Sequence, residues 1–316
     1  MKAITYDRFG SIDVLKWAEL PSPIPVTGQV LIAIRAVSIN VIDSRVRSGV
    51  LGPLVNKKFP KIPGADFSGV VMAVAPDVRG LKKGDEVFGA VDPLKGGAFA
   101  ESVAIAVDQI ALKPASLSFE EAAALPVGAL AALLSVRDLG RLERGGELLV
   151  HGASGGVGLF ATQIAKQLGA RVTAVAGTEG IKAVRSAGAD VVIDYKMAGD
   201  REFSQLFDVI INASGKLPFR IGKQYLKPKG RLIEPSPTIP VFIGSKIANL
   251  FRRKQHMMLQ TTVSSKDLAH LKSLVDSSKL RVVIAKTYPW TEFRQAFMDQ
   301  EKGGTVGKIV LGLQSP

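Results

Sequence analysis

The sequence contains no cysteine and only three histidines in a chain of 316 residues. The absence of cysteine excludes disulfide bonds, thiolate zinc sites and a cysteine nucleophile. No two of the histidines, His151, His256 and His270, have the spacing of metal ligands, so a histidine-rich metal site is not expected. We expect each of them to be structural or to lie on the surface.

The chain also lacks a long hydrophobic run. The longest uncharged apolar stretch, 122–136, is about 15 residues and falls short of the roughly 20 residues needed to span a bilayer. Since it contains Pro126 and Gly128, we interpret it as a buried connecting helix. The first residues, MKAITYDRFG, have no apolar signal core, so no secretion signal is expected and a cytoplasmic location is predicted.

Basic residues outnumber acidic ones, 41 to 28, and the formal net charge is +13. The simplest interpretation is attraction for anionic ligands such as phosphorylated cofactors. Nucleic-acid binding is not expected, because the basic residues are spread along the chain and form no block long enough for an interaction tail. A contact of Arg252, Arg253 and Lys254 with a membrane surface is left open by the sequence.

The length allows two domains, and a hydrophobic content of 47% supports full cores. Residues 1–120 are rich in candidate strands, such as 30–37 and 67–78, and in prolines that argue against long helices. From Phe119 onward, strands alternate with helical patterns, which predicts a doubly wound parallel sheet of an α/β fold. The expected strands are 148–150, 171–176, 191–193, 207–211 and 231–234.

The last part of the chain reads as an amphipathic helix at 267–278, followed by strands at 282–286 and 307–311. These mixed elements indicate that the chain returns to its first domain. The predicted boundaries are therefore 1–122 with 264–316 for a β-rich catalytic domain, and 123–263 for the nucleotide-binding domain.

Residues 148–169 read LLVHGASGGVGLFATQIAKQLG, that is, strand, glycine-rich turn and helix. This context makes the turn a candidate dinucleotide site. Gly155 would let the backbone approach a pyrophosphate, Gly158 would let the helix pack closely on the strand, and the helix N-terminus would offer N–H groups. Ala153 stands where the first glycine of the usual motif falls, and an ordinary strand–helix turn is the alternative interpretation.

The residues after the expected strand 171–176 indicate which dinucleotide binds. NAD sites usually place an acid there for the ribose 2′-hydroxyl. Here the strand ends without an acid, Glu179 comes only later, and the cations Lys182 and Arg185 follow. This pattern favours a 2′-phosphate and therefore NADPH, although Lys182 and Arg185 could also be simply solvated.

With these residues in hand, the chain resembles the zinc-independent medium-chain dehydrogenase/reductase family, in its quinone oxidoreductase (zeta-crystallin-like) branch. The segments that carry the resemblance are 38–43, 47–49, 62–69, 84–89, 123–126, 153–158 and 307–310. The resemblance implies a GroES-like catalytic domain, a Rossmann domain, and hydride transfer from NADPH to a quinone or an α,β-unsaturated carbonyl. In zinc-dependent relatives a cysteine falls near Ser38 and a histidine–acid pair near Ala65 and Asp66, so no metal is expected here.

The resemblance also assigns residues to the site. Asn40 and Asp43 would lie near the nicotinamide and its ribose as catalytic residues, although a turn cap would explain them as well. Lys182 would meet the 2′-phosphate and Lys308 would sit near the nicotinamide end. The remaining cofactor contacts implied are Ala153, Ser154, Gly155, Gly156, Val157, Gly158, Gly177, Thr178, Tyr195, Asn212 and Ser214.

One departure affects the chemistry. Relatives often carry an active-site tyrosine just after Arg-Ser-Gly, where this chain has Val50 and Leu51 after Gly49. The missing proton donor argues against the alternative of an enoyl-thioester reductase and leaves protonation to solvent. A nucleic-acid-binding or structural, crystallin-like protein is the alternative from another class. The expected partners are a small quinone or enone substrate and a second copy of the chain in a homodimer.

Overall fold

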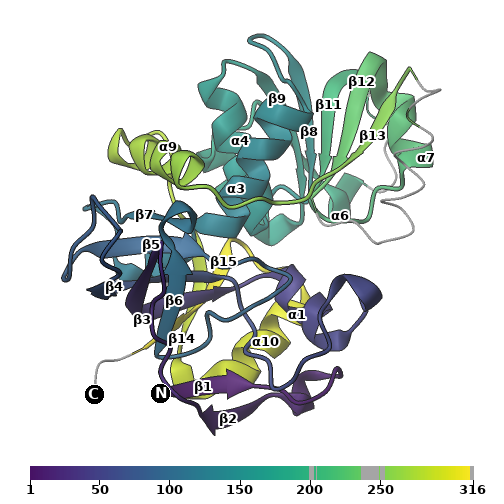
Figure 1. The fold of residues 1–316 in the computed structure, drawn as a ribbon. Coiled ribbons are helices and arrows are strands. Elements are labelled where there is room, and N and C mark those ends of the chain that lie inside the picture. Colours follow the sequence, from purple (N-terminus) through teal and green to yellow (C-terminus); the bar gives the residue numbers. More distant parts are fainter. Residues whose placement is uncertain (199–202, 204, 236–248, 250–252, 314–316) are drawn as a thin grey trace.

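The computed structural model describes residues 1–198, 203, 205–235, 249 and 253–313. Two lobes lie one above the other in Figure 1, each built around its own sheet. The upper lobe carries a parallel sheet, and the lower lobe carries the N-terminal strands together with the end of the chain. Within the described residues, no helix has both the length and the apolar character to cross a membrane.

The upper sheet has six strands, all paired in parallel, in the order β10-β9-β8-β11-β12-β13. The strands are β8 (Glu147–His151), β9 (Arg171–Ala176), β10 (Val191–Asp194), β11 (Phe207–Asn212), β12 (Leu226–Glu234) and β13 (Gln255–Met258). Because β8 lies in the middle and the order reverses beside it, the carboxyl edge next to β8 is the expected ligand crevice of a doubly wound sheet. The predicted Rossmann architecture is confirmed.

Helices cover both faces of this sheet. Leu148 and Val150 of β8 pack into one apolar core with residues of α3 (Pro126–Leu134) and α4 (Gly156–Gln167). The intervening Leu149 belongs to a separate core on the other face, beside α7 (Phe219–Gly222). Side chains alternate across a strand, so a strand buried on both faces reads as the continuous apolar run seen here. On the β10 side, α5 (Ile181–Ser186) packs against β9 and β10.

The apolar stretch 122–136 is buried, as predicted, but it is not one helix. It contains the end of α2 (Phe119–Ala123), all of α3 and the start of a π-turn (Ser135–Leu139). Pro126 occupies the first turn of α3, where the missing N–H costs nothing. Ser118 and Glu121 form a capping box at the start of α2, which explains the sharp onset of helix after the β-rich region.

The lower sheet follows the order β14-β15-β3-β4-β5-β7, with β6 (Ser102–Ala106) also paired to β3. Its strands are β3 (Gln29–Ile39), β4 (Asp66–Val74), β5 (Glu86–Ala90), β7 (Ile110–Leu112), β14 (Ile284–Pro289) and β15 (Lys308–Gly312). β4 is shorter than the predicted strand 67–78, because a turn closed by Val78 N–H and Ala75 O follows it. β1 (Lys2–Thr5) and β2 (Lys16–Glu19) form a separate pair.

The end of the chain joins the N-terminal lobe. After α9 (Ser265–Asp276), which packs against α3 and β7, β15 pairs antiparallel with β3 and β14 pairs with β15. α10 (Phe293–Lys302) lies beside α1 (Val41–Ser48) in the lower lobe (Figure 1). β15 therefore brings residues from the end of the chain next to the start of α1. The exact limits of the two domains stay a prediction.

Candidate active site

The glycine-rich turn lies between β8 and α4, at the carboxyl edge of the parallel sheet. α4 begins at Gly156, with Gly155 as its N-cap in an extended conformation. A Cβ on Gly158 would stand 2.4 Å from Gly152 O and 2.6 Å from Ala153 Cα, so only glycine lets α4 pack this closely on the strand. A Cβ on Gly155 would meet nothing nearer than an oxygen at 3.6 Å, which leaves this backbone open to a ligand.

The other residues of the turn are held by the protein itself. Ala153 is fully buried and its N–H donates to Val175 O at 2.8 Å, so alanine fits the first position of the motif. Val157 is partly buried against the main core of the upper lobe. A Cβ on Gly156 would lie 2.6 Å from Lys308 Cδ, which places β15 of the other lobe directly against the turn.

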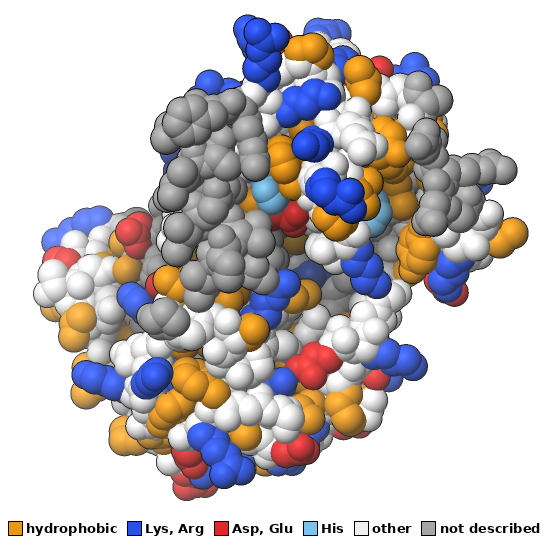
Figure 2. All heavy atoms as spheres, turned by 90° about the vertical axis from the view of Figure 1, so that its right-hand side faces the viewer, with side chains coloured by type: hydrophobic (Ala, Val, Ile, Leu, Met, Phe, Trp, Pro, Cys, Tyr) orange, Lys and Arg blue, Asp and Glu red, His pale blue; other side chains and the backbone are white. Residues whose placement is uncertain are grey.

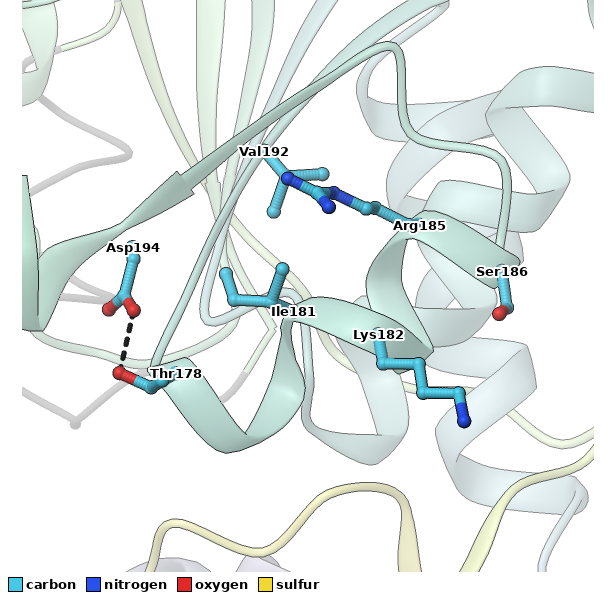
Figure 3. Close-up of a pocket in the computed structure, with 7 residues that line it drawn as sticks. All are labelled: Thr178, Ile181, Lys182, Arg185, Ser186, Val192 and Asp194. Carbon is cyan, nitrogen blue, oxygen red and sulfur yellow. Dashed lines mark hydrogen bonds between the residues drawn. The ribbon is translucent and has the colours of Figure 1, made fainter.

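A pocket of about 600 Å³ lies at the end of β9 and β10. The 3-10 turn Thr178–Gly180, which contributes to it, packs against the glycine-rich turn, since a Cβ on Gly180 would stand 2.3 Å from Ser154 Cβ. Figure 3 shows the lining side chains, which are Thr178, Ile181, Lys182, Arg185, Ser186, Val192 and Asp194. Within the described part of the chain, neither Lys182 nor Arg185 forms a hydrogen bond or an ion pair. In Figure 3, Arg185 extends toward Val192, and Lys182 points to the other side of α5. Two uncommitted cations at this place suit an anionic group.

The acidic side chains of this region already accept hydrogen bonds from neighbouring side chains. Glu179, in the short 3-10 turn Thr178–Gly180, accepts hydrogen bonds from Lys196 Nζ at 2.7 and 2.9 Å. Asp194, at the end of β10, accepts a 2.6 Å hydrogen bond from Thr178 Oγ1 across the pocket (Figure 3). Tyr195 begins the next helical turn, and its hydroxyl would lie 3.1 Å from a Cβ on Gly177. Thr178 and Lys182 therefore line one pocket, and Tyr195 lies close to Gly177; the adenosine site itself stays a prediction.

The two lobes meet beside the glycine-rich turn. Gly307 N–H donates to Ser154 O at 2.9 Å, and Gly155 and Gly307 form a parallel bridge. The next residue, Lys308, is 6% exposed, and its Nζ lies 2.5 Å from Asn40 Oδ1. The amide of Asn40 donates in turn to Asp66 Oδ2 at 2.9 Å. Asn40 and Lys308, which were both predicted to lie near the nicotinamide, come from opposite ends of the sequence and are direct neighbours in the structure.

Asp66 is the centre of this junction, and it is fully buried. Its Oδ2 accepts from Ser38 Oγ at 2.8 Å and lies 3.3 Å from Lys308 Nζ, while its Oδ1 accepts from Val127 N–H at 2.8 Å. We call Ser38, Asn40, Asp66 and Lys308 the junction cluster. The cluster ties β3, β4, α3 and β15 together through a single carboxylate.

Asp43 lies beside the junction cluster at the start of α1. Its Oδ2 accepts a 2.7 Å hydrogen bond from Asn40 N–H, and its buried Oδ1 has no partner in the described structure. Burial raises the pKa of Asp43 to about 7; the charge of Asp66 adds to this, and the Asn40 hydrogen bonds and Lys308 oppose it. Part of its role is therefore the turn cap that the sequence analysis considered.

A second polar network runs along the carboxyl edge of the sheet. His151 Nδ1 lies 2.6 Å from Ser214 Oγ, and Ser214 Oγ lies 3.0 Å from Asn212 Oδ1. Asn212 Nδ2 lies 2.9 and 3.1 Å from the two carboxylate oxygens of Glu234, whose Oε1 is 3.5 Å from His256 Nε2. We call these five residues the edge network. Figure 2 shows His and acidic side chains on this face of the upper lobe, with Lys and Arg side chains nearby.

Comparison with known proteins identifies the family. The alcohol dehydrogenase GroES-like domain model matches residues 26–115, and a model described as zinc-binding dehydrogenase matches residues 187–311. The chain is 32% identical to the chloroplastic quinone-oxidoreductase QR1 of Triphysaria versicolor, over 98% of both sequences. The chain belongs to the medium-chain dehydrogenase/reductase family, in its quinone oxidoreductase branch.

Solved structures of this family agree. The quinone oxidoreductase from Coxiella burnetii has a TM-score of 0.89 and 31% identity, with 99% of each chain covered. The Escherichia coli quinone oxidoreductase complexed with NADPH has a TM-score of 0.84 and 25% identity, covering 99% of this chain and 100% of that one. Membership of this oxidoreductase family confirms the resemblance drawn from the sequence motifs.

Ser38 and Asp66 are the residues that the sequence resemblance sets near the expected metal-ligand positions of zinc-dependent relatives. In this chain they hydrogen bond to each other, and Asp66 makes three further contacts, with Asn40, Val127 N–H and Lys308. In the residues that the structure describes, there is no group of three or more His, Cys, Asp or Glu that could hold a metal ion. Zinc independence, the cytoplasmic location and the homodimer stay predictions.

Sequence reasoning missed Asp66 and Glu234 as members of the site region. Asp66 falls within one of the segments that carry the family resemblance, but its role is visible only when Lys308 is placed beside it. Glu234 ends β12, and an acid at the carboxyl end of a parallel strand is the signal that could have found it. His151 and His256, expected to be structural or to lie on the surface, both lie in the edge network. Arg252 lies outside the described residues, so the basic segment 252–254 is only partly seen.

Proposed function

We propose that the chain is an oxidoreductase that transfers a hydride from NADPH to a quinone or an α,β-unsaturated carbonyl without a metal ion. The observation that carries this proposal is the pocket beside the glycine-rich turn, where Lys182 and Arg185 have no anionic partner in the described structure. The family supplies the reaction class, and the structures related to this chain include one with NADPH bound.

The residues present fit a dinucleotide. The open backbone at Gly155 and the N-terminus of α4 offer N–H groups for a pyrophosphate. Lys182 would hold the 2′-phosphate, and Thr178 and Tyr195 would border the adenosine. When bound, NADPH supplies the hydride.

The reaction asks mainly for positioning from this chain. The junction cluster fixes β15 and the start of α1 against each other, and so holds the two lobes together beside the glycine-rich turn. Hydride addition to a quinone or a conjugated enone leaves a delocalised oxyanion on the substrate, which water can protonate. A dedicated proton donor is therefore dispensable for these substrates, in agreement with Val50 and Leu51 in place of the usual tyrosine.

The test is NADPH oxidation by the purified protein with four substrates: a small quinone, a conjugated enone, the matching saturated ketone and an enoyl-CoA. We expect turnover of the quinone or the enone, none of the saturated ketone, and no effect of a chelator. Loss of activity with chelator would overturn the metal-free mechanism, and preferred turnover of the enoyl-CoA would favour an enoyl-thioester reductase. No dinucleotide oxidation, together with tight nucleic-acid binding that weakens steeply with salt, would favour a nucleic-acid-binding protein.

A further inference from the structure

The edge network crosses four neighbouring strands. His151 ends β8, Asn212 ends β11, Glu234 ends β12 and His256 lies in β13, with Ser214 in the loop after β11. Within the described structure, His151 Nε2 has no hydrogen-bond partner, while Nδ1 has the contact to Ser214. The donor and acceptor roles along this network can be deduced from its geometry.

The backbone of Leu217 fixes the orientation of Asn212. Leu217 O lies 2.9 Å from Asn212 Nδ2 and accepts only, whereas Leu217 N–H lies 3.3 Å from Asn212 Oδ1 and donates only. The same orientation points Nδ2 at both carboxylate oxygens of Glu234. Asn212 Oδ1 is therefore the acceptor that faces Ser214.

This orientation determines the rest. Since Asn212 Oδ1 only accepts, the Ser214 hydroxyl must donate its single proton to it, over 3.0 Å. Ser214 Oγ also accepts from Lys216 N–H at 3.0 Å. The 2.6 Å contact between His151 Nδ1 and Ser214 Oγ then requires a proton on Nδ1. In the neutral ring, Nε2 is left as a hydrogen-bond acceptor.

Two further features support this arrangement. A Cβ on Gly152, which has a φ of +85°, would lie 2.7 Å from Ser214 N, so glycine is required for the Ser214 loop to reach His151. Ser214 N–H also donates to His151 O at 3.0 Å. Burial lowers the pKa of His151, opposed by Glu234 and assisted by Lys216, which favours the neutral ring.

The sheet order shows which part of a ligand would meet His151. The cationic pocket lies beyond β9 and β10, on one side of β8, and the edge network extends to the other side over β11, β12 and β13. A dinucleotide with its pyrophosphate at the glycine-rich turn and its adenosine in the pocket would place its nicotinamide half over the edge network.

We propose that the edge network holds His151 as the Nδ1–H tautomer and that His151 Nε2 accepts a hydrogen bond from a hydroxyl or amide group in the nicotinamide half of the bound dinucleotide. The second part rests on the proposed function. His151 is then a cofactor-binding residue, and Ser214, Asn212 and Glu234 are positioning residues that act through it.

The tautomer is tested first, without any ligand, by ¹⁵N NMR of the histidine rings in the full-length protein. The chain has three histidines, so single substitutions assign the signals. We expect His151 to be neutral at pH 7.5 with the proton on Nδ1, and Ser214→Ala to abolish that strong preference. A proton on Nε2 in the wild type, or an unchanged tautomer in Ser214→Ala, would overturn the network argument.

Ligand contact is tested by titration with NADPH. We expect the Nε2 resonance of His151 to shift on saturation, and His151→Asn, which keeps an N–H donor for Ser214, to weaken binding roughly three- to tenfold. The matched control is His270→Asn on the exposed face of α9, for which no change is expected. An unchanged Nε2 resonance, or unchanged affinity in a folded His151→Asn protein, would refute the contact. If the wild type bound no dinucleotide, the proposed function and this contact would both fail, while the tautomer result would stand.

Discussion

Lys308 and Asp66 meet in the buried junction between the glycine-rich turn and the start of α1, with Nζ 3.3 Å from Oδ2, although 242 positions separate them in the chain. Asp66 is fully buried, and Lys308 is 6% exposed. A buried ion pair of this kind is weak evidence for added stability, because desolvation offsets the Coulomb attraction, but the removal of one partner leaves a buried charge uncompensated.

Lys308→Met is therefore expected to destabilise the protein by about 3–5 kcal/mol, because Asp66 loses its only buried cation in the described structure. Asp66→Asn in the same background should recover part of that loss, since it removes the isolated charge. Urea unfolding of the wild type, both single variants and the double variant gives the coupling energy. Strictly additive free energies would show that the two side chains do not depend on each other.

The regular part of the fold was predictable from the sequence. Strands of the parallel sheet are continuous apolar runs because both faces are buried, and the glycine-rich turn follows the first of them. The predicted strand 171–176 and helix start at Ile181 agree with β9 and α5. The predicted strand 67–78 was too long, because apolar content alone does not show where the ladder of β4 ends and a turn begins.

The polar networks were not predictable in the same way. Pattern rules compare residues that are close in sequence, whereas the edge network joins side chains from four strands and the junction cluster joins the two ends of the chain. Two histidines have no ligand spacing in the sequence, yet His151 is linked to Glu234 through Ser214 and Asn212, and His256 Nε2 lies 3.5 Å from the same carboxylate. Lys308 was placed near the nicotinamide end by resemblance, but its contact with Asn40 and Asp66 required the tertiary structure.

Discrimination between NADPH and NADH should depend on the cations of the pocket, Lys182 above all, which have no partner among the described residues. We expect Lys182→Ala to weaken NADPH binding by about tenfold or more, because a charge-assisted hydrogen bond to phosphate contributes about 1.5–3 kcal/mol. Arg185→Ala should weaken it less, since the Arg185 side chain extends to the other side of α5. NADH binding should change little. Lys272→Ala is the control, since Lys272 pairs with Asp276 on α9. Equal losses for both dinucleotides, measured by fluorescence titration, would contradict a 2′-phosphate at this pocket.

Asp43 should make the stability of the protein depend on pH. Its pKa is about 7 in the folded protein, well above the ordinary carboxyl value, so the folded state binds the proton more tightly than the unfolded state. Ionisation of Asp43 therefore lowers the free energy of unfolding as pH rises from about 4 to about 7. The slope is at most about 1.4 kcal/mol per pH unit. Asp43→Asn keeps an oxygen for Asn40 N–H but cannot ionise. The variant should gain stability relative to wild type between pH 5 and 7 in urea melts, and a constant difference across that range would argue against a neutral buried Asp43.

Alanine substitutions at two glycines of the same turn should have different effects, one on folding stability and the other on NADPH binding. Gly158→Ala places a Cβ 2.4 Å from Gly152 O, so α4 must shift on the strand, and we expect a loss of about 1–3 kcal/mol in folding stability. Gly155→Ala meets no atom closer than 3.6 Å, so its melting temperature should stay close to that of the wild type. The new methyl group stands where a pyrophosphate would approach, so NADPH binding should fall sharply in this variant.

Thermal melts with and without NADPH separate the two effects, because a ligand that binds only the folded state raises the melting temperature. A stable Gly155→Ala protein that still showed the full NADPH shift would place the pyrophosphate elsewhere.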